Sequence, residues 1–150
     1  MIIELNTKSN FLDLIAKKDS GIKRSYLLNS NFNNKLDKIV FVSNLLKEKH
    51  GIKPFIEVKY DFGRRNKRIE IVYTKSLNIN ICKITKISEF DKDYFELLSL
   101  LKDMKNQNEI SNFKINGVLI FMSDYNTDIV ETFLLNQEIY FHHMNIEKLQ

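Results

Sequence analysis

Residues 53–86, KPFIEVKYDFGRRNKRIEIVYTKSLNINICKITK, contain the pattern that decides the fold. Apolar and polar residues alternate through much of three runs, at 55–60, 68–74 and 79–85, and most of the apolar residues are β-branched or aromatic. Such alternation is typical of strands that bury one face. The polar segments FGRRNK and KSLN separate the runs. The stretch therefore predicts three consecutive antiparallel strands joined by two tight turns.

Helical periodicity precedes and follows these strands. Apolar residues recur at spacings of three and four from residue 36 to 46 and again from 90 to 104. Asn34 is placed to cap the first helix and Gly51 to end it, whereas Ser88, three residues before Asp91, resembles a cap for the second. The predicted sheet is therefore flanked by helices.

The end of the chain predicts a strand, a helix and a strand. Residues 117–122, GVLIFM, form a continuous apolar run typical of a strand that is buried on both faces. A short helical pattern at 129–134 follows, and then EIYFHH, which predicts a last strand. Two strands joined through a helix run parallel, with a right-handed crossover, so the sheet is expected to be mixed.

Length and composition indicate one intracellular domain. The chain has 150 residues, which is enough to bury a core, and we expect residues 1–34 to pack as an extension on a core formed by 35–150. In the extension, MIIEL predicts a short strand and residues 10–18 a short helix capped by Asn10. The sequence shows no signal peptide, no membrane-spanning run and only one cysteine, Cys82, so a soluble protein in the cytoplasm is expected.

The order of predicted elements resembles the restriction-endonuclease-like fold of the PD-(D/E)XK superfamily, which includes Mrr-type nucleases and archaeal Holliday junction resolvases. The resemblance covers residues 35–150, and its most specific part is the ending, 117–149. RIEIVYTK, at 68–75, lies where the superfamily has its first acidic strand, and INICKITK, at 79–86, lies where it has E/Q-x-K. The resemblance implies an α/β fold with a mixed central sheet flanked by helices.

The resemblance also implies a metal-dependent endonuclease. In that chemistry two oxygen ligands hold Mg²⁺ against the scissile phosphate, and a lysine stabilises the nucleophile or the developing charge. Glu70 matches the acidic position and Lys83 the lysine. Ile81 lies where the superfamily needs Glu or Gln, so the motif is degenerate.

Three nearby carboxylates could supply the missing metal ligand. They are Glu57 on the neighbouring strand, Asp61 at its end and Glu48 on the first helix. Each also has a purely structural interpretation as a surface charge or turn residue. Glu57-Val58-Lys59 spells E-x-K as well, but no acidic strand precedes it.

A basic cluster between the first two strands is the candidate DNA-binding surface. Its members are Lys59, Arg64, Arg65, Lys67 and Arg68. Arg binds phosphate bidentately and Lys acts as a point charge, so a hairpin tip with this composition could contact a nucleic-acid backbone. A solvated turn is the alternative interpretation.

Two classes of function follow. The first is a DNA-binding protein of nuclease-like fold, either without catalysis or as a Mg²⁺-dependent endonuclease, a hydrolase that commonly acts as a homodimer. The second is a non-catalytic assembly or protein-interaction module. The segment 112–149 is similar to the end of the jaw domain of the fifth shared subunit of eukaryotic RNA polymerases, and a phage or mobile-element inhibitor is a further alternative.

Overall fold

The computed structural model describes residues 1–7, 9–16, 21–29, 31–62, 65–75, 77–110, 112–122 and 139–143. It divides into two compact units, Met1–Ile79 and Asn80–Gln150, and the boundary falls within strand β5 (Asn78–Thr85). Within the described residues no helix is long and apolar enough to span a membrane.

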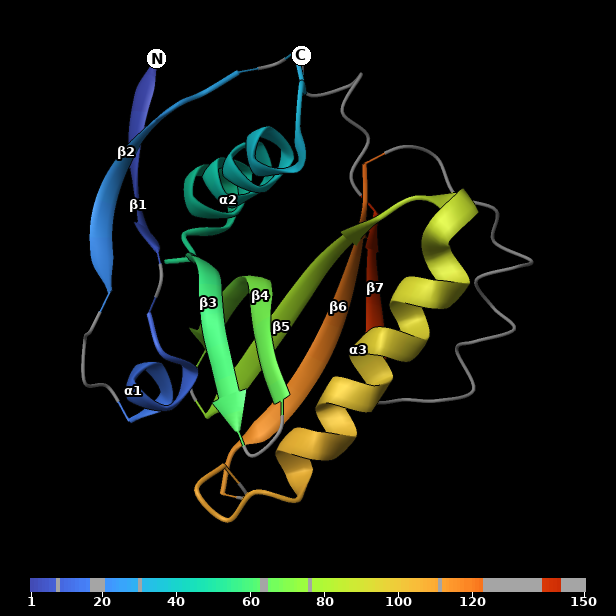
Figure 1. The fold of residues 1–150 in the computed structure, drawn as a ribbon. Helices are drawn as coiled ribbons and strands as arrows, with labels where there is room; N and C mark the ends of the chain where they lie inside the picture. The colour runs from blue at the N-terminus through green and yellow to red at the C-terminus, as the bar shows by residue number, and fades with distance from the viewer. Residues whose placement is uncertain are drawn as a thin grey trace. The chain divides into compact units, whose positions relative to one another are not determined.

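The first unit contains a mixed sheet. Its strands are β1 (Ile2–Thr7), β2 (Ile22–Leu27), β3 (Phe55–Phe62) and β4 (Arg65–Lys75), in the order β2-β1-β3-β4 (Figure 1). β1 is antiparallel to β2 and parallel to β3, and β3 is antiparallel to β4. Strand β2 was not predicted, because IKRSYL is exposed at nearly every position and has no alternating apolar face.

Two helices cover opposite faces of the first unit's sheet. Helix α1 (Phe11–Ile15) places the ring of Phe11 5.7 Å from that of Tyr60, and helix α2 (Lys35–His50) reaches Glu70, which is on the other face of the β3–β4 pair. The predicted Asn caps are both confirmed. The side-chain oxygen of Asn10 accepts a hydrogen bond from the Leu12 amide, and that of Asn34 accepts one from the Asp37 amide, each at 2.9 Å.

A left-handed residue ends α2. Gly51 has a φ of 62° and donates its amide to the Leu46 carbonyl. Glycine adopts this conformation without the steric cost of a Cβ, so the predicted end of the helix is also confirmed.

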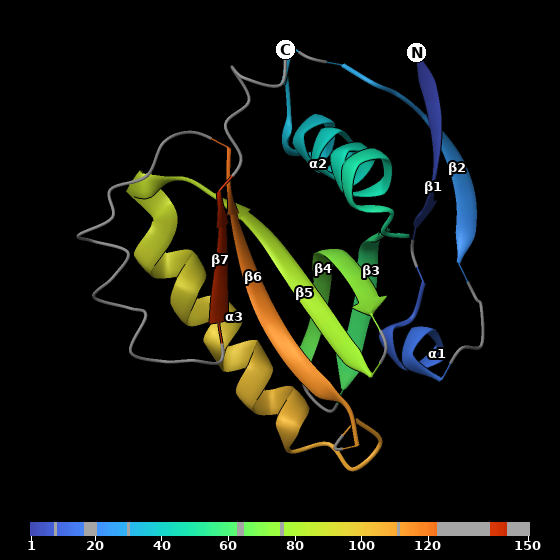
Figure 2. The same cartoon turned by 180° about the vertical axis from the view of Figure 1, so that it is seen from behind.

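The second unit contains the remaining elements. They are β5, a 3₁₀ turn (Ile87–Glu89), α3 (Phe90–Lys105), β6 (Lys114–Phe121) and β7 (Ile139–His143). The strands lie in the order β5-β6-β7, and β6 and β7 are parallel, which confirms the two last predicted strands and their parallel pairing (Figure 2). The helix predicted at 129–134 lies outside the described residues. The Ser88 cap is wrong, because α3 begins at Phe90 after the 3₁₀ turn and no side chain caps it.

Helix α3 packs closely on β6. A Cβ at Gly117 would lie 3.0 Å from both Leu101 Cδ1 and Leu97 Cδ2, so any side chain at this position would require the two leucines to move. Phe90 and Phe121 bring their rings to 5.4 Å, and both are buried. The chain therefore belongs to the α/β class, with mixed strand pairing and flanking helices, as the sequence predicts at this level.

Candidate functional site

The basic residues lie on paired strands, not in a long hairpin tip. The sequence predicted a six-residue turn, FGRRNK, but β3 continues to Phe62 and β4 begins at Arg65. Lys59 pairs with Arg68 and Tyr60 with Lys67, and the side chains of Lys59, Lys67 and Arg68 are exposed. Strand pairing continues through this segment because extended backbone satisfies its amides across the ladder.

Residues that face one another in an antiparallel pair lie on the same side of the sheet. Lys59 and Arg68 therefore share one face of this ribbon, and Lys67 lies on the other. Arg65 is at the end of β4, opposite Phe62, whereas Arg64 lies outside the described residues. The predicted basic residues that the structure describes are thus brought together at one end of the β3–β4 pair.

The net charge of the chain is concentrated in this segment. Residues 59–68 contain five of the 23 Lys and Arg residues and one of the 19 Asp and Glu residues, which gives the same net charge, +4, as the whole chain. The other 140 residues have as many cationic as acidic residues. We call residues 59–68 the basic ribbon. A polyanion that approaches the protein would be attracted to the basic ribbon more strongly than to the rest of the chain, where positive and negative charges are equal in number.

Two of the predicted metal ligands occupy facing positions farther along the same strands. The pairs Ile56–Ile71 and Val58–Ile69 enclose Glu57 on β3 and Glu70 on β4, so the two backbone positions are opposite one another, although the two residues are not themselves a pair in the register. Glu57 has a φ of 50°, which is uncommon for a residue other than glycine. Like charges at facing positions repel, so this arrangement needs a compensating cation.

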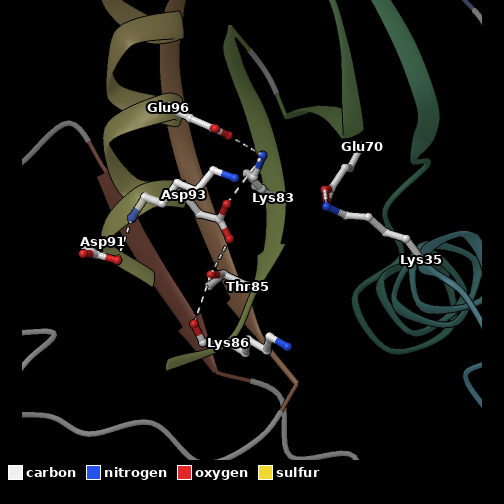
Figure 3. Close-up of polar contacts among 9 residues, drawn as sticks. Lys35, Glu70, Lys83, Thr85, Lys86, Asp91, Asp93 and Glu96 are labelled. Carbon is white, nitrogen blue, oxygen red and sulfur yellow. Dashed lines mark hydrogen bonds and ion pairs between the residues drawn. The ribbon is translucent and has the colours of Figure 1, made fainter. Parts of the chain in front are cut away.

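Lys35, the first residue of α2, supplies such a cation. Its Nζ lies 3.1 Å from Glu70 Oε2, and the Glu70 side chain is 12% exposed (Figure 3). The Oδ2 atom of Asp61 instead lies 3.9 Å from Lys59 Nζ, at the exposed end of the strand. Glu48 lies near the other end of α2, and it does not form a metal-binding group with Glu57 and Glu70, since no such group of three side chains occurs among the described residues.

Lys83, the predicted catalytic lysine, lies in the second unit among polar partners from α3. Its Nζ is 2.9 Å from Glu96 Oε2 and 3.7 Å from Asp93 Oδ1. The Thr85 hydroxyl donates to Asp93 Oδ2 at 2.7 Å, and the Asp93 side chain is only 8% exposed (Figure 3). We call these four residues the Lys83 cluster. It explains how a lysine is accommodated in a strand that is largely buried, because a buried charge is stabilised when it is paired.

Sequence reasoning did not identify the partners of Lys83. Asp93 and Glu96 are three residues apart and therefore on one side of α3, next to the apolar residues Phe90, Tyr94 and Leu97. Two acidic residues at that spacing on the buried side of a helix indicate a buried cation nearby, and this signal could have identified the partners of Lys83. Ile81 precedes Lys83 by two residues and is fully buried, so its position belongs to the core and is not an open ligand position.

The arrangement thus has two chemical features. The first unit contains the basic ribbon and the facing pair Glu57 and Glu70, and the second contains the Lys83 cluster. Among the residues that the structure describes, no group of three or more His, Cys, Asp or Glu side chains is arranged to hold a metal ion. No protein-family model, curated protein or solved structure matches the chain.

Proposed function

We propose that the protein binds DNA through the basic ribbon, by contacts with backbone phosphates and without cleaving the strand. The observation that supports this most strongly is the concentration of the entire net charge in ten residues, with Lys59 and Arg68 facing one another and exposed. Phosphate contacts position a protein on DNA without reading its sequence, so we expect recognition of the backbone rather than of bases.

The end of the ribbon beyond Lys59 has a suitable form for this role; at Lys59 itself, β3 also pairs with Asn10, and the Lys59 amide donates to the Ser9 carbonyl. A two-stranded β-ribbon fits the major groove of B-DNA, which is about 12 Å wide. Lysine and arginine on both faces of such a ribbon would reach phosphates on either side of the groove. The ion pair of Lys59 with Asp61 is long and exposed, and exposed pairs contribute only about 0–1 kcal/mol, so exchanging it for a phosphate costs little.

A metal-dependent endonuclease is the second candidate, and the facing positions of Glu57 and Glu70 favour it. Mg²⁺ is commonly held by one or two carboxylates together with water and substrate phosphate, so these two residues have the right chemistry to hold it. A bound Mg²⁺ would polarise the scissile phosphate and lower the pKa of a water nucleophile. We rank this candidate second because Lys35 already neutralises Glu70, and Lys83 has acidic partners of its own.

A salt-dependent binding measurement tests the proposal. The variant Lys67→Gln/Arg68→Gln removes two cations from the basic ribbon, and Lys49→Gln/Lys102→Gln removes two exposed cations from helices. Affinity for a short labelled duplex would be followed by fluorescence anisotropy across a series of salt concentrations. Each phosphate contact contributes about 0.9 to the slope of log K against log salt, so the ribbon variant should bind more weakly with a slope shallower by up to about 2.

The control variant should keep both the affinity and the slope of the wild-type protein. Equal losses of DNA affinity in the two variants would show that only the total charge of the protein matters. Unchanged affinity of the ribbon variant would show that Lys67 and Arg68 are not part of the interface. Absence of binding by the wild-type protein would refute the proposal and favour the protein-interaction alternative.

The same samples, incubated with Mg²⁺ or Mn²⁺ and with linear or branched DNA, separate the two candidates. Binding without cleavage supports the first candidate. Metal-dependent cleavage that is lost in Glu70→Ala would replace it with the endonuclease.

A further inference from the structure

Strand β2 is the outermost strand of the first unit (Figure 1). Among the described residues it pairs with β1 alone, so one of its two edges is left without a neighbouring strand. Five of its six residues are exposed, and only Tyr26 is half-buried. An edge of this kind presents a row of backbone N–H and C=O groups to which another strand can be added.

Exposed apolar side chains gather beside this edge. Six large apolar side chains are exposed among the described residues, and four of them are on the first two strands or next to them: Met1, Ile2, Ile22 and Leu27. Ile2 pairs with Leu27, so these two side chains lie on the same face. Single exposed apolar residues are normal, whereas a group confined to one pair of strands is typical of an interaction surface.

The hydrogen bonds between β1 and β2 determine which backbone groups of β2 point outward. The Leu28 amide donates to the Met1 carbonyl at 2.9 Å, one position beyond the Ile2–Leu27 pair. Residues of an antiparallel pair alternate between hydrogen-bonded and non-hydrogen-bonded positions. The backbone groups of residues 22, 24, 26 and 28 therefore point toward β1. The residues whose backbone groups point outward are Lys23, Ser25 and Leu27.

This alternation restricts how two copies of β2 can pair. In an antiparallel dimer with two-fold symmetry, outward-pointing residues must face one another, so one residue faces its own copy at the axis. Lys23 or Arg24 at the axis would face a like charge, which is destabilising. Tyr26 at the axis would align only residues 25–27 of the strand. Ser25 at the axis aligns residues 23–27 and brings no two like charges opposite one another.

We infer that the protein forms a homodimer in which β2 pairs with β2 of a second copy, antiparallel, with Ser25 at the two-fold axis. The Ser25 pair and the two Lys23–Leu27 pairs exchange backbone hydrogen bonds. The exposed Leu27 is covered by the methylene groups of the partner's Lys23, whose ammonium group stays in water. Arg24 faces the ring of the partner's Tyr26, where a guanidinium is attracted to the aromatic face.

The same charges favour a closed dimer over an open stack of chains. Parallel addition in register would place Lys23 beside the partner's Lys23 and Arg24 beside the partner's Arg24, and like charges at adjacent positions repel. The inference goes beyond the proposed function and does not depend on it, because β2 and the basic ribbon have no residue in common.

Sedimentation velocity of the full chain, from about 1 µM to about 1 mM, tests the dimer. A strand edge of six residues makes a small interface, so the dimer should dissociate on dilution within this range. Ser25→Lys places two like charges opposite one another and should raise the dimer Kd at least about tenfold. Ser88→Lys is the control, because it adds the same charge at an exposed position of the 3₁₀ turn in the second unit.

The control should keep the wild-type Kd. Melting temperatures measured at the lowest concentration should be equal for the two lysine variants, which would show that the folded monomer is intact in both. The variant Lys67→Gln/Arg68→Gln should dimerise normally whether or not it binds DNA, so a failure of the proposed function can be distinguished from a failure of this inference.

Cysteine pairing tests the register. Arg24 and the partner's Tyr26 form a non-hydrogen-bonded pair with Cα atoms about 4.5 Å apart, which is within the range of about 4.4–6.8 Å that a disulfide spans. A mixture of Arg24→Cys and Tyr26→Cys, oxidised with oxidised glutathione, should therefore give a disulfide-linked dimer. Each variant alone should not, because its two cysteines would be offset by two residues. The native Cys82 is buried.

A protein that stays monomeric at every concentration would overturn the inference and would leave this edge to an extended segment of another protein. A wild-type Kd in Ser25→Lys, or equal losses in the two lysine variants, would also overturn it. Cross-linking of Arg24→Cys alone would place the axis at Arg24, and cross-linking of Tyr26→Cys alone would place it at Tyr26. Either result would refute the register centred on Ser25.

Discussion

Replacing Lys83 with methionine tests whether the Lys83 cluster stabilises the fold. The substitution keeps a long apolar side chain and removes the ammonium group. Asp93, whose side chain is 8% exposed, would keep its hydrogen bond from Thr85 and lose the cation 3.7 Å away, and Glu96 would lose its partner at 2.9 Å.

The expected loss is about 2 kcal/mol of unfolding free energy. Removing one partner of a fully buried ion pair costs about 3–5 kcal/mol, and a hydrogen bond to a charged group contributes about 1.5–3 kcal/mol. Solvent reaches the cluster, since the Lys83 side chain is 25% exposed and that of Glu96 40% exposed. Screening by this solvent lowers the expected cost towards the second range.

Equilibrium urea unfolding of wild-type, Lys83→Met, Asp93→Asn and the double variant measures the effect and its origin. A double-mutant cycle should give a coupling of about 1 kcal/mol between Lys83 and Asp93. Lys86→Met is the control, because the Lys86–Glu89 pair is 3.9 Å long and exposed on both sides, and its loss should change stability by less than about 0.5 kcal/mol. A Lys83→Met variant as stable as the control would refute the structural role.

Two further substitutions test the core of the second unit. Ile81→Glu should destabilise the protein by at least about 4 kcal/mol in urea unfolding, because it removes a fully buried apolar side chain and buries a carboxylate. A stable variant that binds Mg²⁺ would instead indicate that position 81 once held a metal ligand. Gly117→Val should lower the unfolding free energy by about 1–3 kcal/mol, and Gly117→Ala by less, because added atoms meet Leu97 and Leu101; wild-type stability of the valine variant would contradict the packing described for α3.

The sequence predicted most elements because their signals are local. Period-two alternation identified β3 to β5, helical spacing identified α2 and α3, and the caps Asn10 and Asn34 act within four residues of sequence. Strand β2 carries no such signal, since Ile22 and Leu27 are exposed and its stability depends on pairing with β1. The specific assignment to a restriction-endonuclease-like fold stays a prediction.

The candidate sites were less predictable because they depend on tertiary pairing. Clustering along the chain identified the basic residues, but their extended conformation depends on the β3–β4 register. The partners of Lys83 come from a helix ten or more residues later in the chain, and no local sequence pattern shows which strand residue that helix contacts.

The backbone conformation of Glu57 has a consequence for how the gene would diverge. A positive φ is costly for most L-residues, at roughly 1–2 kcal/mol, and glycine or asparagine would relieve that cost. Selection for stability alone would therefore tend to replace Glu57 with one of these residues. Retention of glutamate at this position in diverged copies of the gene would measure selection for a carboxylate opposite Glu70.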